Sequence, residues 1–439
     1  MDSLKIIMYP WLAMGHLTSF LHISNKLAER GHKIFFLLPP KTQPKLQQFN
    51  LHPHLITFLP LTIPHLQGLP HGAQTTADVP FHLHSLLRRA MDLTQPAIEQ
   101  LLNELKPEFI FFDFTPWLPA LARRYKVKSV HYCTISPAAV AYMIRDEPSA
   151  EAFLEPPAGF PPSAIKLYAH EARALLQVNN SREYDGATTF VQRMLTCFEE
   201  CDGLGFRSCR EIEGPYCDFL EMRFKKPVML AGFVAPKAAE PWARLDHKWR
   251  EWLDQFETKS VVYCAFGSEA RLTKDQFQEV VLGLELTGLP FLAALKPPLG
   301  EEALPVRVRE SKGVVVDDWV QQQLILKHPS VGCFVTHCGS GSLSEAMVSE
   351  CVMAAAPHAG DQVINARVAA GELRAAVEVE RDGDGLLTKE GVAEAVRMVM
   401  GDGREVRENH AKLRELLLGP GFEDSYMDGF VRNLFLLLH

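Results

Sequence analysis

Short apolar segments alternate with helix-length segments along nearly the whole chain, and this alternation restricts the fold more than any other feature. Strands that alternate with helices form parallel sheets covered by helices on both faces. The sequence therefore predicts an α/β fold. In the first half the apolar segments are KIIMYPW, KIFFLLP, HLITFLPL, EFIFFDF, KSVHYC and GLGFRSC. In the second half they are SVVYCAFGS, PFLAALKPP, GVVVDDW, VGCFVTH, VMAAAP and AAVEVE. The longer segments between them include SFLHISNKLAERG and HSLLRRAMDLTQPAIEQLLNEL.

The alternation is interrupted once, by GFVAPKAAEPWARLD, which is rich in Pro and Ala and has no apolar period. A chain of this length suffices for two domains of about 200 residues, each with its own core. We expect an N-terminal domain over 1–233, a linker over 234–246 and a C-terminal domain over 247–422. The last helix, 423–439, carries too much Leu and Phe to stay in solvent. Two doubly wound sheets that face each other bring the carboxyl ends of their strands to one cleft, where ligands bind.

Composition excludes several classes of protein. The net charge is −8 and the basic residues are dispersed, which does not suit a nucleic-acid groove. The chain has no long apolar run of transmembrane length, and its start, MDSLKIIMYPWL, lacks the basic end and clean apolar core of a signal peptide. The nine Cys form no CxxC pair, so reduced thiols are favoured over disulfides or zinc ligands. We expect a monomeric cytoplasmic protein without a membrane anchor.

A 44-residue segment, 319–362, contains the groups needed to hold a nucleotide, a diphosphate and a sugar. Within it, the apolar VGCFVTH followed by GSGSLSE predicts a buried strand, a Gly-rich turn and the start of a helix. The first backbone N–H groups of a helix are free and its dipole is positive at that end, so a diphosphate can bind there.

This segment resembles the C-terminal signature of plant UDP-sugar-dependent glycosyltransferases, the large family that glycosylates small secondary metabolites. The resemblance implies a GT-B fold, in which two doubly wound Rossmann-like domains face a cleft and the last helix crosses back onto the first domain. It implies a UDP-sugar as donor substrate and a small-molecule acceptor, with no cofactor and no metal.

The resemblance also implies roles for residues at the nucleotide end of the segment. Trp319 would stack on the uracil, a contact worth about 1 to 3 kcal/mol per base. The backbone of Val320 and the region of Gln322 would read the edge of the base. Glu345 would accept hydrogen bonds from the ribose hydroxyls.

The diphosphate would lie at the start of the predicted helix. By the same resemblance, His337 would direct a ring N–H at it, helped by the amides near Gly339 and Gly341 and by Ser342. Ser268, which ends SVVYCAFGS, would add a hydroxyl from a second strand end. Its alternative role is an ordinary N-cap of the helix that contains TKDQF.

Asp361 and Gln362 would bind hydroxyls of the transferred sugar, but two nearby positions depart from the family pattern. The family usually has Trp and Asn where this chain has Ser340 and Gly341. The missing Asn removes one phosphate donor, and the missing Trp reshapes the wall beside the sugar. Together with DQFQEVVLGLELTGLPF and FDFTPW, this variation looks like the branch that adds a second sugar to a sugar already on a flavonoid, terpenoid or steroid.

The candidate catalytic residues lie in the first half of the chain. His16 follows the first strand at its turn into a helix, and Asp113 ends the very apolar EFIFFDF. Strands one and four commonly flank the same crevice, so Asp113 could accept a ring N–H of His16, fix its tautomer and stabilise the imidazolium. Histidine suits abstraction of a proton from a hydroxyl. The resemblance matches the same two residues to a general base and its supporting acid, in an inverting transfer.

The acceptor site is predicted from variable loops of the first domain that are rich in Trp, Phe, Met, Leu and Pro. These loops are 11–14, 65–84, 114–117, 136–145 and parts of 180–195. Three alternatives remain: a nucleotide-dependent oxidoreductase, a catalytically silent UDP-sugar binder and a retaining transferase. The oxidoreductase would need GxGxxG after the first strand, where this chain has WLAMGH.

Overall fold

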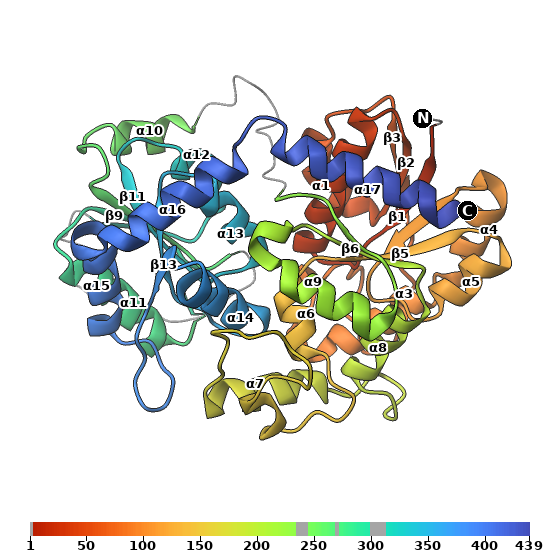
Figure 1. Cartoon of the computed structure of the whole chain (residues 1–439), viewed down its shortest axis with the longest axis horizontal. Helices are drawn as coiled ribbons and strands as arrows, with labels where there is room; N and C mark the ends of the chain where they lie inside the picture. The colour runs from red at the N-terminus through yellow and green to blue at the C-terminus, as the bar shows by residue number, and fades with distance from the viewer. Residues whose placement is uncertain (1–2, 234–244, 268–271, 299–312) are drawn as a thin grey trace.

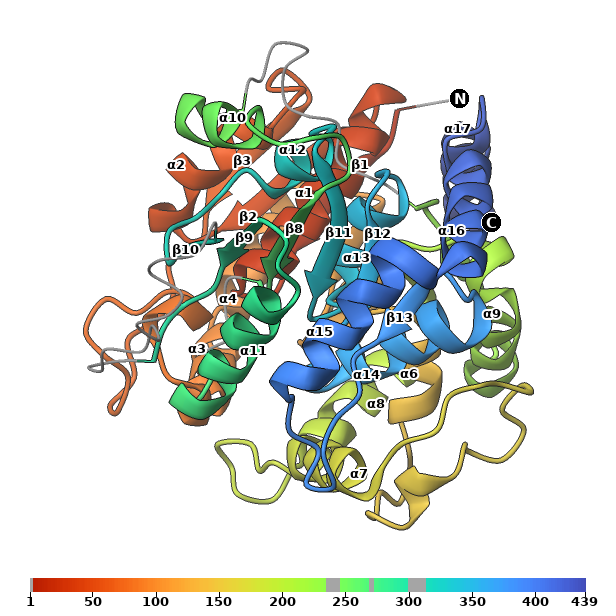
Figure 2. The same cartoon turned by 90° about the vertical axis from the view of Figure 1, so that its left-hand side faces the viewer.

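The computed structural model describes residues 3–233, 245–267, 272–298 and 313–439. Ser268 and most of the expected linker lie outside these ranges. Two sheets, both entirely parallel, organise the described chain. Figure 1 shows the two sheets in separate halves of the molecule, each surrounded by its own helices, and Figure 2 views the molecule from the side of the second half.

The first sheet has seven strands in the order β3-β2-β1-β4-β5-β6-β7. The strands are β1 Lys5–Tyr9, β2 Lys33–Leu38, β3 Ile56–Pro60, β4 Phe109–Phe112, β5 Lys128–Cys133, β6 Gly203–Phe206 and β7 Val228–Leu230. The α-helices of this half are α1 Met14–Glu29, α2 Gln43–Leu46, α3 His84–Asp92, α4 Gln95–Leu105, α5 Leu118–Arg124, α6 Pro137–Met143, α7 Ala169–Asn179, α8 Phe190–Glu200 and α9 Arg210–Phe224.

The second sheet has six strands in the order β10-β9-β8-β11-β12-β13. The strands are β8 Val261–Ala265, β9 Phe291–Ala294, β10 Gly313–Val316, β11 Val331–Thr336, β12 Val352–Ala355 and β13 Ala376–Glu378. The α-helices from here to the end of the chain are α10 His247–Leu253, α11 Lys274–Leu286, α12 Gln322–Leu326, α13 Ser340–Met347, α14 Asp361–Arg367, α15 Lys389–Arg397, α16 Arg404–Leu417 and α17 Phe422–Leu438.

The predicted α/β class with two parallel sheets is confirmed, while three local expectations differ from the structure. The short strand β7 was not predicted. Helix α1 begins five residues earlier than the segment SFLHISNKLAERG, because the N–H groups of His16 and Leu17 already bond to the carbonyl of Ala13. The segment 84–105 forms two helices, because Pro96 has no N–H to continue α3 and lies instead in the first turn of α4.

Helices α16 and α17 connect the two halves along one face (Figure 1). Met427, Phe430 and Leu434 of α17 are buried in the same core as Ile6 and Met8 of β1. Arg30 at the end of α1 pairs with Asp424 and Asp428 of α17. The last helix therefore packs on the first sheet, far from the sheet that it follows in the sequence.

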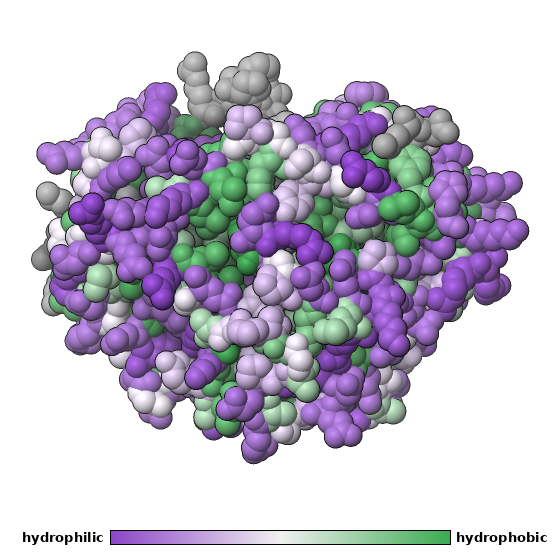
Figure 3. All heavy atoms as spheres, viewed as in Figure 1, coloured by the Kyte–Doolittle hydropathy of each residue, from purple (hydrophilic) through white to green (hydrophobic). Residues whose placement is uncertain are grey.

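The two halves also contact each other through α14. Ser136, the N-cap of α6, donates its hydroxyl to Asn365 of α14 at 2.8 Å. Arg367 of α14 pairs with Glu171 of α7 at 3.0 Å, and both side chains are buried. In Figure 3 much of the apolar surface gathers near the middle of the molecule, whereas hydrophilic side chains cover its flanks. These contacts hold the carboxyl ends of the two sheets close to one another.

Candidate active site

His16 and Asp113 are brought together by two neighbouring strands. β1 and β4 pair in register Tyr9 to Phe112, so the segments that follow them leave the sheet at the same edge. His16 lies in the first turn of α1 and Asp113 directly follows β4. The Nδ1 atom of His16 is 2.6 Å from Oδ2 of Asp113, and the Asp113 residue is 1% exposed.

This contact determines which ring nitrogen of His16 can take up a proton. A carboxylate that accepts from Nδ1–H leaves Nε2 of a neutral imidazole as an acceptor, the form that a general base requires. The other carboxylate oxygen of Asp113 accepts the backbone N–H of Phe114 at 2.8 Å. The hydroxyl of Thr134, at the end of β5, lies 3.3 Å from both ring nitrogens of His16.

An aromatic wall formed by Trp11, Phe114 and Phe190 adjoins His16. The ring of Phe114 lies 5.1 Å from the imidazole of His16 between ring centroids, 5.6 Å from Trp11 and 5.4 Å from Phe190. These three residues come from the turn after β1, the turn after β4 and the start of α8. The Phe114 ring is tilted by 36° to Trp11 and by 83° to Phe190, so the rings form an angled apolar wall. An apolar wall next to a base suits an aromatic acceptor.

The predicted strand–turn–helix of the donor segment is present as β11 and α13. The backbone reverses at Cys338, whose φ is 64°, and the helix begins at Ser340 with Gly339 as its N-cap. Gly339 offers no side-chain cap. The N–H groups of the first turn of α13 therefore have no intrahelical partner and are available to an anion.

His337 fits into a slot between two turns. A Cβ built on Gly267 would lie 2.9 Å from Nε2 of His337, and one built on Gly339 would lie 2.6 Å from the same atom. Burial lowers the pKa of His337 to about 4, so the ring is neutral near pH 7. Its buried Nδ1 has no hydrogen-bond partner among the described residues. The ring therefore retains unused hydrogen-bonding capacity beside the start of α13.

At the nucleotide end, Trp319 is 75% exposed, whereas Val320 is buried. The amide of Gln322 donates to Glu345 at 2.7 Å and to Ser342 at 3.2 Å. Burial raises the pKa of Glu345, and the hydrogen bond from Gln322 opposes this shift. The Gln322 side chain, which the sequence associated with the base edge, is thus engaged with the residues expected to bind ribose and phosphate.

At the sugar end, Asp361 and Gln362 begin α14. Burial raises the pKa of Asp361 to about 6, while a hydrogen bond from Asn365 and the nearby His16 act in the opposite direction. An electrostatic interaction thus links Asp361 of the second half to His16 of the first. The side-chain oxygen of Gln362 accepts the N–H groups of His358 and Ala359 at 2.9 and 3.1 Å, which leaves its NH2 group for a ligand.

A cavity of about 40 Å³ lies between the two halves, beside these groups. Thr134, Ser340 and Asn365 line it, together with Arg207, which directly follows β6. Arg207 forms no hydrogen bond or ion pair with another described residue. Arg207 was not predicted from the sequence, although it directly follows a strand, the same signal that identified Asp113.

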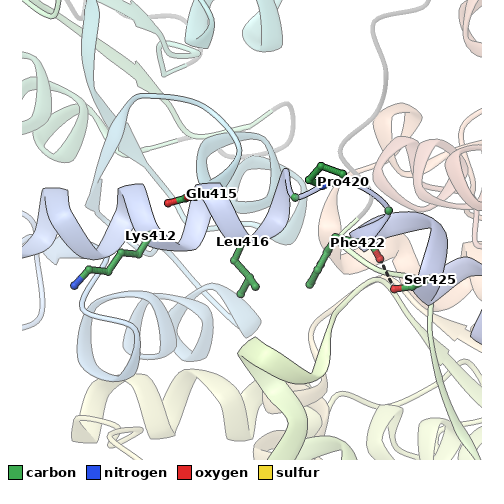
Figure 4. Close-up of a pocket in the computed structure, with 8 residues that line it drawn as sticks. Lys412, Glu415, Leu416, Pro420, Phe422 and Ser425 are labelled. Carbon is green, nitrogen blue, oxygen red and sulfur yellow. Dashed lines mark hydrogen bonds between the residues drawn. The ribbon is translucent and has the colours of Figure 1, made fainter.

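A larger hollow of about 650 Å³ lies at the bend between α16 and α17. Figure 4 shows Leu416 and Phe422 among its lining residues. None of the predicted site residues lines it.

Among the residues with described positions, no cluster of three or more His, Cys, Asp or Glu side chains could hold a metal ion. Within the same residues, no helix is both long and apolar enough to cross a membrane.

Comparison with known proteins supplies an independent line of evidence. The family model described as UDP-glucoronosyl and UDP-glucosyl transferase matches residues 216–417. A cyanidin 3-O-galactoside 2''-O-xylosyltransferase of Actinidia chinensis var. chinensis is 53% identical over 98% of this chain and 98% of its own length. An anthocyanidin 3-O-glucoside 2''-O-glucosyltransferase of Ipomoea nil is 49% identical over 97% of this chain and 96% of its own length.

Solved structures agree with the fold. The structure of Arabidopsis thaliana UGT89C1 complexed with UDP-L-rhamnose has a TM-score of 0.77 at 23% identity, covering 99% of this chain and 100% of that one. The structure of Glycyrrhiza uralensis UGT73P12 has a TM-score of 0.79 at 20% identity, covering 99% and 96%. At such identities the likeness establishes the GT-B architecture alone. The nearly full-length relatives at 53% and 49% identity establish more: this chain belongs to the plant UDP-dependent glycosyltransferases.

Proposed function

We propose that this enzyme transfers a sugar from a UDP-sugar to a sugar hydroxyl of a flavonoid glycoside, with inversion at the anomeric carbon and without a metal. The contact between His16 and Asp113 is the observation that carries this proposal. The names of the Actinidia and Ipomoea relatives support an anthocyanidin 3-O-glycoside as acceptor and the 2''-hydroxyl of its first sugar as the attacking group.

In the proposed reaction, Nε2 of His16 takes the proton from the acceptor hydroxyl. The acceptor oxygen bonds to the anomeric carbon while the bond from that carbon to the diphosphate breaks, and the electron pair leaves with UDP. Because attack and departure occur on opposite faces, the configuration inverts. Asp113 stabilises the imidazolium that forms, as the acid of a catalytic triad does. A positioned general base contributes about 100- to 10,000-fold.

The donor is proposed to lie along the segment 319–362. Trp319 stacks on the uracil beside the backbone of Val320. Glu345, which Gln322 orients by a hydrogen bond, accepts hydrogen bonds from the ribose hydroxyls. The diphosphate binds at the start of α13 through the amides near Gly339 and Gly341.

Further proposed donor contacts complete the site. His337 and the hydroxyl of Ser342 bind the diphosphate, and Ser268 adds a second hydroxyl. Asp361 and Gln362 bind the sugar. Backbone dipoles and neutral donors thus stabilise the leaving diphosphate, so chelation of divalent metal by EDTA should leave the rate unchanged.

We also propose that the enzyme works in the cytoplasm as a monomer. Its nine cysteines are all unpaired and buried, which suits a reducing compartment. Localisation of a fluorescent fusion and light scattering of the purified protein test these two points.

A UDP-release screen tests the proposed function. UDP-glucose, UDP-xylose, UDP-galactose, UDP-rhamnose and UDP-arabinose are crossed with anthocyanidin 3-O-glycosides and with steroid and triterpene glycosides. Release with an anthocyanidin glycoside, and its loss in His16→Ala with UDP binding retained, supports the proposal. No release with any pair would favour a silent UDP-sugar binder. Retention of configuration in the product, measured by NMR, would contradict the inverting mechanism.

A further inference from the structure

The backbone of Phe114 is held by a hydrogen bond on each side of its Cα. Its N–H donates to Oδ1 of Asp113 at 2.8 Å, and its carbonyl accepts from Nε of Arg193 at 2.7 Å. Its ring packs against the imidazole of His16. Phe114 thus contacts both members of the proposed catalytic pair, and Arg193 bonds to Phe114 without contacting either member directly.

Arg193 is itself firmly fixed. It lies on α8, 80 residues beyond Asp113 in the sequence, and is 5% exposed. Its two terminal nitrogens donate to the two carboxylate oxygens of Asp92, at 3.0 and 2.6 Å. The planar guanidinium fork suits this bidentate pairing and still leaves Nε for the Phe114 carbonyl.

The carboxylate of Asp92 also contacts the turn that follows β4. Asp92 accepts the indole N–H of Trp117 at 2.9 Å. The turn 113–117 is therefore held at two points, its Phe114 carbonyl by Arg193 and its Trp117 ring by Asp92. Both of these residues belong to helices, α8 and α3, that the loop itself does not adjoin in sequence.

A second buried arginine provides a natural comparison. Arg88 of α3 pairs with Glu183 at 2.8 Å, and Glu183 lies 3.9 Å from Arg193. Arg88 is also largely buried and lies over the ring of Phe190. Among the described residues, Arg88 donates hydrogen bonds to Glu183 and none to the turn 113–117. The two arginines therefore share an ionic network, but only Arg193 bonds to Phe114.

We propose that Arg193 is a positioning residue for catalysis, which sets the orientation of the His16–Asp113 pair through the backbone and ring of Phe114. This inference rests on the proposed function, because it assumes that His16 is the base. Small displacements of reacting groups are costly: a misplacement of about 1 Å reduces a rate by about 100-fold. The N–H and the carbonyl of Phe114 belong to two adjacent peptide planes that meet at its Cα. Loss of the Nε bond frees the carbonyl plane to rotate, which removes one restraint on the position of this Cα and so on the ring and the N–H of Phe114.

The test uses Arg193→Lys, with Arg88→Lys as the matched control. Lysine keeps the positive charge beside Asp92 but lacks the fork that serves Asp92 and Phe114 together. We expect Arg193→Lys to lower kcat by about 10- to 100-fold with the KM for the UDP-sugar nearly unchanged. Arg88→Lys should lower kcat by less than about 3-fold. Melting temperature and UDP affinity are measured for both variants, which distinguishes a local change from partial unfolding.

A double-mutant cycle with Asp113→Asn identifies the route of the effect. If Arg193 acts through the catalytic pair, Arg193→Lys should lower kcat by less than about 3-fold once Asp113 is already neutral, since coupled residues do not contribute additively. An equal loss in both backgrounds would overturn the proposal, as would a kcat unchanged by Arg193→Lys in a folded, UDP-binding protein. Failure of the His16 assignment is detected separately, by His16→Ala that retains activity.

Discussion

Asp361→Asn should make this enzyme more stable and less able to use its donor. Burial raises the pKa of Asp361 from 3.8 to about 6 in the folded state. At about 1.36 kcal/mol per pKa unit, ionised Asp361 destabilises the fold by about 3 kcal/mol near neutral pH. Asparagine has nearly the same shape, carries no charge, and can still accept the hydrogen bond from Asn365. The variant should therefore recover most of that free energy.

The sign of the pH dependence follows from proton binding. Between pH 3.8 and about 6 the folded state keeps a proton on Asp361 that the unfolded state has released. The free energy of unfolding of the wild type therefore decreases as pH rises through this window, and it stays low above it. The advantage of Asp361→Asn should be largest at pH 8, about half as large at pH 5, and absent near pH 3.5.

Thermal unfolding by calorimetry at pH 8 and pH 5 measures this difference. For a domain of 150–250 residues, about 3 kcal/mol corresponds to a rise in Tm of about 6 to 12 °C. Asp402→Asn is the control, because it makes the same chemical change at an exposed position of the same half. A Tm gain in Asp361→Asn that is equal at both pH values would refute the reasoning, because it could not come from the buried charge.

Binding measurements test the other half of this prediction. If Asp361 accepts hydrogen bonds from hydroxyls of the donor sugar, Asp361→Asn should bind UDP with the affinity of the wild type. It should lose the additional affinity with which the wild type binds the UDP-sugar. Weakened binding of UDP itself would mean that α14 had moved and that the change was not confined to the sugar.

Three further variants probe the donor site. Trp319→Ala should weaken UDP binding by about 1 to 3 kcal/mol with little change in Tm, because the ring is 75% exposed; unchanged affinity by calorimetry would contradict a stacking role. Gly341→Asn should tighten UDP binding, because a Cβ at this position meets no atom within 4 Å and the amide adds a donor at the start of α13; equal affinity would mean that the side chain does not reach the diphosphate. Gly339→Ala should weaken UDP binding, because its Cβ would lie 2.6 Å from Nε2 of His337 and displace the ring; an unchanged Kd would argue against a role for His337.

The fold was predictable from the sequence because parallel strands buried on both faces form continuous apolar segments that are easily recognised. EFIFFDF and VGCFVTH contain β4 and β11 in full. β7 was missed because Val228–Leu230 is only three residues long. The break between α3 and α4 was missed because residues 84–105 continue one helical pattern across Pro96.

The juxtaposition of His16 and Asp113 was predictable for a topological reason, since a residue that ends one parallel strand lies near residues that end its neighbours. Arg193 could not be found in this way. It is in the interior of α8, and only the packing of α8 against the turn 113–117 brings it to Phe114. Sequence position predicts which residues meet at the edge of a sheet, but not which helix side chains reach that edge from another layer.

The departures from the family pattern at Ser340 and Gly341 affect the side chains at the start of α13 and not its backbone. α13 begins at Ser340 just after the reversal at Cys338, and the N–H groups of its first turn have no intrahelical partner, so the backbone part of an anion site is present. The departures concern side chains only: Gly341 has no side-chain amide, and the hydroxyl of Ser340 has no hydrogen-bond partner among the described residues beside the cavity that Arg207 also lines. A diphosphate would therefore depend here on backbone amides and His337 more than on side-chain donors of α13. For this reason Gly341→Asn, which adds one side-chain donor at a position where a Cβ meets no atom within 4 Å, measures how much binding free energy such a donor adds to what the backbone of the helix start supplies.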